Sequence, residues 1–282
     1  MKLTILIHCP DKAGIINAVT HFLYNEGGNV VYLDQHVDKA AEVFFMRLEA
    51  EFDGSLSLAD FRKEFQNTLA EMYQMKWSCH LEGSLPKMAI FVSKYNHCLY
   101  DLLSRYQSGE LEVEIPFILS NHPDLDQIAK QFDIPYHHIP VLKGQKQEAE
   151  EQQLELLKKN QVDFIVLARY MQIISPKLIH YYPNKIINIH HSFLPAFAGA
   201  KPYHAAFERG VKIIGATSHY VTEELDAGPI IEQDVTTVSH SHSIKDFIAK
   251  GRDLEKIVLS RAVKLHVNRK TMVYNNKTVI FT

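Results

Sequence analysis

Two polar side chains that could perform chemistry occur at the end of an apolar run, residues 186–190, IINIH. If this run is a β-strand, Asn188 and His190 project from the same face, because successive side chains alternate along a strand. Pro195 indicates that the strand has ended by that point. Ligands of open α/β sheets bind beyond the carboxyl ends of the strands, and an amide beside an imidazole supplies two donors for a carbonyl oxyanion. The alternative is a plain strand end with one buried polar side chain and one exposed histidine.

A carboxylate follows in the segment 219–229, HYVTEELDAGP, where a predicted strand runs into an acidic loop. Asp226 lies 38 residues after Asn188 (226 − 188). A carboxylate next to a histidine raises the pKa of the imidazole and favours its charged form. It can also orient a water molecule or accept its proton. The alternative is a solvated surface turn.

A third candidate is the segment 167–176, LARYMQIISP, which follows an apolar strand and ends at a predicted helix start. Its mixture of apolar and polar side chains at a strand end could hold a flat heterocycle. The alternative is ordinary packing between a strand and a helix.

These segments belong to a region, residues 87–282, in which short apolar runs alternate with helical stretches. The alternation is typical of a doubly wound, mostly parallel sheet in the α/β class. A further strand, 230–238, follows a turn and is predicted to be antiparallel or at an edge. A long helix over 243–267 is predicted to cover the sheet, and a hairpin to follow at Asn275-Asn276. The main strands are predicted at 88–93, 112–119, 136–141, 163–168, 186–190 and 213–221, with helices that include 96–106 and 146–160.

Residues 1–84 predict a separate, smaller domain with the order βαββαβ, which is the ferredoxin-like arrangement. Its strands are predicted at 3–9, 29–37, 42–52 and 76–82, and its helices at 14–26 and 57–72. The second helix carries Leu58, Phe61, Phe65, Leu69 and Met72 on one apolar stripe. Residues 82–87 contain Gly83 and Pro86 and are the predicted linker.

Composition excludes several classes of protein. Apolar residues make up 46% and charged residues 22% of the 282 residues, which is typical of globular domains and excludes a disordered chain. The net charge of −3 gives no electrostatic basis for binding nucleic acid or an anionic membrane. Three cysteines without a C-x-x-C pair, and no membrane-length apolar run, predict a reducing, cytoplasmic location. Although 16 histidines are present, none shows metal-ligand spacing, so no metal is expected.

Taken together, the three candidate segments resemble the folate-dependent formyltransferases. The shared motifs are N-I-H-x-S-x-L-P, L-A-x-x-M-x-I-x-S upstream, and H-x-V-x-x-x-L-D-x-G downstream. The resemblance implies that Asn188, His190 and Asp226 form the catalytic triad of that family. It also implies that the substrate pocket is lined by Met171, Gln172, Ile173, Ile174, His219, Thr222 and Leu225, the first four around the pterin ring.

The stretch after the first strand of this domain distinguishes two subfamilies. Glycinamide ribonucleotide transformylases have a glycine-rich loop there, whose backbone N–H groups hold the phosphate of their substrate. Residues 92–99, VSKYNHCL, contain no glycine. The run SKYNHCLYDLL is instead similar to formyltetrahydrofolate deformylases, which transfer the formyl group to water.

The N-terminal domain resembles an ACT domain, a small module that senses amino acids. The resemblance rests on the βαββαβ order and on the opening Asp11-Lys12-Ala13-Gly14. It implies that Asp11 and Gly14 contribute to a regulatory ligand site, since Gly14 permits close approach to a helix N-terminus. Deformylases combine the two domains in this order. A homo-oligomer is expected, because the edges of an exposed sheet need covering.

The resemblance implies hydrolysis of 10-formyltetrahydrofolate to tetrahydrofolate and formate, which would supply formate and balance one-carbon pools for purine biosynthesis. The folate is the substrate, and no cofactor or metal ion is expected. One alternative is formyl transfer to an amine acceptor. Another is a non-catalytic regulator that binds folate and an amino acid, although the intact Asn, His and Asp set argues against it. Lys12, Lys94 and Arg169 are all candidates for binding the glutamate carboxylates of the substrate.

Overall fold

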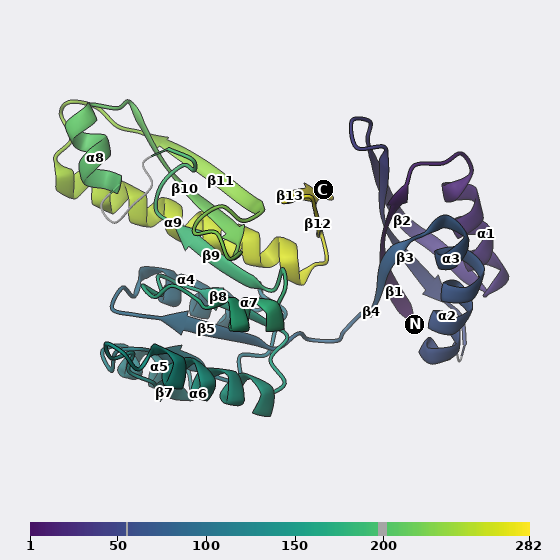
Figure 1. Ribbon diagram of the computed structural model, residues 1–282, viewed down its shortest axis with the longest axis horizontal. Helices are drawn as coiled ribbons and strands as arrows, with labels where there is room; N and C mark the ends of the chain where they lie inside the picture. The colour runs from purple at the N-terminus through teal and green to yellow at the C-terminus, as the bar shows by residue number, and fades with distance from the viewer. Residues whose placement is uncertain (55, 197–201) are drawn as a thin grey trace. The chain divides into compact units, whose positions relative to one another are not determined.

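The chain folds into two units, each with its own apolar core, in a computed structural model that describes residues 1–54, 56–196 and 202–282 (Figure 1). The first unit comprises Met1–Ser84 together with Ile280–Thr282, and the second comprises Leu85–Val279.

The first unit is a four-stranded antiparallel sheet in the order β2-β3-β1-β4. Alternate residues of β1, such as Leu3, Ile5 and Ile7, are fully buried and pack with apolar side chains of the helices. This is the ferredoxin-like order that the ACT resemblance implies. The elements are β1 (Lys2–Pro10), α1 (Ile15–Asn25), β2 (Gly28–Asp38), β3 (Val43–Phe52), α2 (Leu58–Phe65), the π-helical turn η1 (Gln66–Ala70), α3 (Glu71–Tyr73) and β4 (Lys76–Leu81).

The second helix of this unit differs from the continuous helix predicted over 57–72. A π-helical turn, η1, interrupts it between α2 and α3. A π turn holds more residues than an α turn, so the apolar stripe loses its phase after it. Phe61 and Phe65 are buried as predicted, but Met72 is 69% exposed.

The second unit contains a seven-stranded, mostly parallel sheet in the order β11-β10-β9-β8-β5-β6-β7. Strands β5 to β9 run parallel to one another, whereas β10 and β11 are antiparallel, as expected for the edge strand at 230–238. The strands are β5 (Met88–Val92), β6 (Ile118–Ser120), β7 (Tyr136–His138), β8 (Phe164–Leu167), β9 (Ile186–His190), β10 (Ile213–Tyr220) and β11 (Ile230–Thr237).

Two of these strands are shorter than the sequence predicts, and a proline accounts for each. The strand predicted at 112–119 begins only at Ile118, after Pro116, and the strand predicted at 136–141 ends at His138, before Pro140. Proline has no N–H to donate to the sheet, so it interrupts the ladder on either side.

Helices cover the sheet, and the longest of them forms part of the support for the site. Helix α9 (Ile244–Val267) packs against β9, β10 and β11 and against α4 and α8 (Figure 1). The capping box of Ser243 and Asp246 satisfies its first N–H groups. None of the described helices combines the length and apolar character needed to cross a bilayer. The remaining elements are α4 (His97–Gln107), α5 (Asp126–Gln131), α6 (Lys146–Lys159), α7 (Pro176–Tyr181), α8 (Pro202–Arg209) and the hairpin β12 (Thr271–Tyr274) and β13 (Lys277–Ile280).

The carboxyl ends of the parallel strands β8 and β9 lie at the same edge of the sheet, because the strands pair in register from Ile165 with Ile186 to Leu167 with Asn188. The loop after β10 returns to this edge through a close contact at Gly228, where an added Cβ would lie 1.8 Å from the carbonyl oxygen of Tyr220. The backbone itself therefore requires glycine at this turn.

We expect Gly228→Ala to lower the free energy of unfolding by about 3 kcal/mol, because a backbone atom cannot yield to the new methyl group. The matched control is Gly210→Ala, where a new Cβ meets nothing within 4 Å and the cost of its φ of +69° is about 1 kcal/mol. Urea unfolding of both variants measures the difference. Equal losses in the two variants would contradict the close contact.

Candidate functional site

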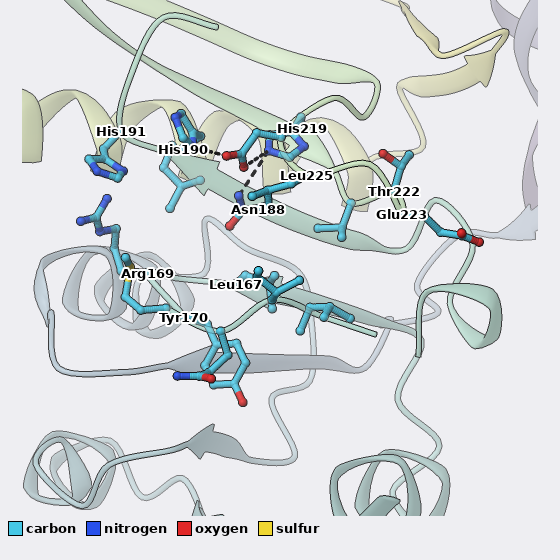
Figure 2. A pocket seen from close by; sticks show the side chains of 17 residues that line it. Leu167, Arg169, Tyr170, Asn188, His190, His191, His219, Thr222, Glu223 and Leu225 are labelled. Atoms are coloured by element: carbon cyan, nitrogen blue, oxygen red, sulfur yellow. Dashed lines mark hydrogen bonds and ion pairs between the residues drawn. The ribbon is translucent and has the colours of Figure 1, made fainter. Parts of the chain in front are cut away.

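A pocket of about 470 Å³ opens at the carboxyl end of β8 and β9, a volume typical of small-molecule sites (Figure 2). Three segments that are distant in sequence form its walls: the loop after β8, the end of β9, and the end of β10 with the loop that follows. The lining residues are Leu167, Arg169, Tyr170, Met171, Gln172, Ile173, Ile174, Asn188, Ile189, His190, His191, His219, Val221, Thr222, Glu223, Leu225 and Asp226.

The pairing of β9 with β10 places Asn188 next to His219. The two residues are direct partners in the antiparallel register, and Asn188 Nδ2 lies 3.2 Å from His219 Nε2. His219 Nδ1 lies 2.9 Å from the carbonyl oxygen of Tyr220. Since a carbonyl only accepts, Nδ1 carries a hydrogen, and Nε2 accepts from Asn188. The amide nitrogen of Asn188 keeps a second N–H for a ligand.

His190 and Asp226 are hydrogen-bonded to each other at the same place. His190 Nδ1 lies 3.2 Å from Asp226 Oδ2, and His219 Nε2 lies 3.6 Å from Asp226 Oδ1. The hydrogen bond from His190 holds the pKa of Asp226 well below its ordinary value, against the opposing effect of burial. Asp226 is therefore a carboxylate at any physiological pH, and it fixes the hydrogen of His190 on Nδ1.

The other ring nitrogen of His190, Nε2, is buried and has no hydrogen-bond partner among the described residues. His190 as a whole is only 5% exposed. A buried polar atom without a partner costs free energy, so its presence needs an explanation. A carboxylate–imidazole pair with a free Nε2 can accept a proton from a nucleophile and return it to a leaving group.

The predicted pterin-binding segment forms one wall of the pocket with exposed apolar side chains. Met171 is 49% exposed, Ile173 61% and Leu225 64%. Apolar side chains that gather at a pocket mark a surface that a ligand can cover. The structure brings all seven predicted substrate-binding residues into the pocket lining: Met171, Gln172, Ile173, Ile174, His219, Thr222 and Leu225.

Sequence reasoning missed residues that support the site from outside the three motifs. Ser93 is buried after β5, accepts a hydrogen bond from the backbone N–H of Met171 at 3.0 Å, and donates one to Asn121 at 2.6 Å. Glu255 is 1% exposed in the middle of α9. A charged residue beside Leu254 and Val258, on the buried face of that helix, was the only sequence signal for it.

Arg169 is not placed as a surface cation. It is 8% exposed, and its Nε lies 3.4 Å from Glu255 Oε2. Lys94, the other candidate in this unit, lies outside the pocket lining.

In the first unit, Gly14 adopts a φ of +92° at the N-cap of α1, a conformation suited to glycine, and the backbone N–H of Asp11 donates to the carbonyl oxygen of Glu42.

One group of three side chains among the described residues has the proximity that a metal site requires: His97, Cys98 and Glu255. Two observations make it a poor donor set. Glu255 already accepts from His97 and Tyr203, and the Arg169 cation lies beside it. Burial raises the pKa of Cys98 well above its ordinary value, which opposes the thiolate that a metal needs. The three cysteines are free and buried.

Comparison with known proteins finds similarity in both units. The formyl transferase family model matches residues 86–263, and the ACT domain model matches residues 3–65.

Relatives with known names match over nearly the full chain. The formyltetrahydrofolate deformylase of Synechocystis sp. is 51% identical over 99% of this chain and 98% of its own. The crystal structure of a formyltetrahydrofolate deformylase from Pseudomonas syringae covers 100% of this chain and 95% of that chain, with a TM-score of 0.97 and 45% identity. Glycinamide ribonucleotide transformylase 1 from Symbiobacterium toebii covers 72% of this chain and 98% of that chain, with a TM-score of 0.68 and 25% identity.

We expect the stability contributed by Asp226 to depend on pH. Because its pKa is lowered in the folded state, this contribution is complete above the ordinary value of 3.8 and decreases as the pH falls below that value. Asp226→Asn should therefore be less stable than the wild type at pH 5 to 7, and the difference should shrink between pH 4 and pH 3. Urea unfolding across this range measures the difference in stability, and a difference that stays constant with pH would contradict the lowered pKa of Asp226.

Proposed function

The chain belongs to the formyltetrahydrofolate deformylase family, and we propose that the pocket of its second unit hydrolyses 10-formyltetrahydrofolate to tetrahydrofolate and formate. The observation that carries this proposal is the free Nε2 of His190, held beside the Asp226 carboxylate and next to the amide of Asn188. Such a set serves hydrolysis of an amide-type bond, because it combines a proton acceptor with a donor for the oxyanion.

In the proposed binding mode, the pterin ring of the folate covers the apolar wall formed by Met171, Ile173 and Leu225. The N10-formyl group then lies at Asn188 and His190, between this wall and the far end of the pocket. Asn188 donates its second N–H to the formyl oxygen, and its orientation is fixed by the bond to His219. Burial of the ligand strengthens this hydrogen bond, because the local dielectric constant falls when water leaves.

The reaction proceeds by addition of water and elimination of the folate amine. Nε2 of His190 accepts a proton as the water oxygen bonds to the formyl carbon, and the resulting imidazolium is stabilised by Asp226. Asn188 and the imidazolium stabilise the tetrahedral oxyanion. His190 then returns the proton to N10 as the C–N bond breaks, which releases tetrahydrofolate and formate. The low pKa of Asp226 favours His190, rather than Asp226 itself, as the group that takes up the proton.

We further propose the cellular setting that the family implies. The product formate would supply one-carbon units for purine biosynthesis, in the cytoplasm, where three free cysteines remain reduced. The ACT-type unit would bind an amino-acid effector near Asp11 and Gly14, and its sheet edges would pair in a homo-oligomer.

Asn188→Ala should reduce formate release from 10-formyltetrahydrofolate by at least about 100-fold, since loss of one oxyanion donor typically costs 100- to 1000-fold. Asp226→Ala should reduce it by at least as much, because it removes the carboxylate that orients His190 and stabilises its imidazolium form. The assay contains no amine acceptor, so it measures transfer to water alone. Asp253→Ala, which changes an exposed carboxylate of α9, is the matched control and should retain wild-type activity. Circular dichroism establishes that each variant folds. Formate release at the wild-type rate from a folded Asn188→Ala or Asp226→Ala variant would exclude this mechanism.

Metal chelation should leave the rate of formate release unchanged, because the proposed steps use only protein side chains and water. The enzyme is incubated with EDTA and with 1,10-phenanthroline, and formate is measured before and after. A loss of activity that added metal restores would show that a metal ion takes part.

A further inference from the structure

A buried cluster of charged side chains lies behind one end of the pocket, and the mechanism above does not use it. Its centre is Glu255, which is 1% exposed. Tyr203 donates its hydroxyl hydrogen to Oε1 at 2.6 Å, His97 Nε2 lies 2.8 Å from Oε2, and Arg169 Nε lies 3.4 Å from the same oxygen. Elements α4, α8, α9 and the loop after β8 each contribute one member.

Packing holds this cluster in one arrangement. Gly251 lies one helical turn before Glu255, and an added Cβ there would lie 2.1 Å from Cζ of Tyr203, so the tyrosine ring occupies the space of a missing side chain. Burial acts to raise the pKa of Glu255, but the hydrogen bond from His97 and the charge of Arg169 outweigh it and lower this pKa. Glu255 is therefore an anion, and a buried anion needs the cation that it has in Arg169.

Arg169 connects the cluster to the pocket. Its guanidinium group lies 4.9 Å from the centre of the Tyr95 ring, and its backbone adopts a φ of +64°, which costs free energy in any residue but glycine. Figure 2 shows Arg169 and His191 at one end of the pocket and Thr222 and Glu223 at the other. Asn188 and His190 lie between the two ends. With the pterin ring placed on the apolar wall as proposed above, the end at Arg169 is the side left for a formyl acceptor.

The fold alone does not explain why water is the acceptor, because it is shared with a transformylase named for an amine-bearing substrate, glycinamide ribonucleotide. We propose that Arg169, held in place by Glu255, closes the acceptor end of the pocket and so restricts formyl transfer to water. This inference rests on the proposed function. The bulk of the guanidinium group excludes an amine, and its charge repels the protonated form of the amine. A neutral water molecule passes. Arg169 thus determines specificity and takes no part in the proton transfers.

The test measures the products formed from 10-formyltetrahydrofolate in the presence of glycinamide as the amine probe. Formate and N-formylglycinamide are quantified by mass spectrometry, and a reaction without enzyme supplies the background. Arg169→Gly suits the backbone conformation and should raise the ratio of N-formylglycinamide to formate by about tenfold or more, the scale on which a small change in a pocket alters selectivity. Arg169→Lys retains the cation and should keep formate as the main product.

The matched control is Gln161→Gly. Gln161 has the same kind of backbone conformation, with a φ of +54°, but is exposed and lies outside the pocket lining, so its product ratio should equal that of the wild type. Arg169→Gly leaves Glu255 buried without its cation, which can prevent folding. The double variant Arg169→Gly/Glu255→Gln removes both charges together, and the same rise in the ratio is expected from it.

An unchanged ratio of N-formylglycinamide to formate, in a folded variant that still releases formate, would overturn the inference. A higher KM for the folate with no change in this ratio would also overturn it, because Arg169 would then be a ligand of the folate itself. Loss of both products in a folded variant would also overturn it, because Arg169 would then belong to the hydrolytic machinery. Failure of the wild type to release formate would instead refute the proposed function, so the two failures are distinguishable.

Discussion

The antiparallel pairing of β9 with β10 is the constraint on which the site depends. Because Asn188 and His219 are partners in that register, the amide is fixed by the imidazole, and the imidazole is fixed by the carbonyl group of Tyr220. The loop after β10 then carries Asp226 back to both histidines. A shift of the register by one residue would turn every side chain of the strand to the opposite face, so the ladder hydrogen bonds determine the chemistry as well as the sheet.

Two carboxylates, the half-buried Asp226 and the buried Glu255, organise the second unit, and their partners give them different roles. Asp226 faces two histidines at the pocket, one of which keeps a nitrogen without a protein partner, so this carboxylate can support proton transfer. Glu255 accepts hydrogen bonds from a histidine and a tyrosine, and the charge of Arg169 lies 3.4 Å away, so this carboxylate acts as a fixed support. Each charge is tolerated because its partners replace the water that it loses on folding.

A deformylase and a glycinamide ribonucleotide transformylase share this fold, so a difference in acceptor has to come from the side chains around the reacting carbon. Here the loop after β5 has no glycine, and the loop after β8 presents a buried arginine in a left-handed conformation. Both features place side chains where glycine would leave open space. The ACT-type unit has its own sheet and core, so its sequence can change without altering the sheet of the second unit.

The sequence by itself determined the class of fold and the three motifs, because apolar periodicity and strand-end polar residues are local properties. It also placed Asn188 and His190 on one face of one strand, which follows from the alternation of side chains. Pro116 and Pro140 shortened two predicted strands through a local property, the missing N–H. The π-helical turn in the first unit was not predicted from the apolar stripe. Only the tertiary structure brought His219 opposite Asn188, Asp226 to His190, and Glu255 to Arg169. The last pair joins residues 86 positions apart (255 − 169), and no local pattern records it, because the two charges meet only when α9 packs onto the sheet.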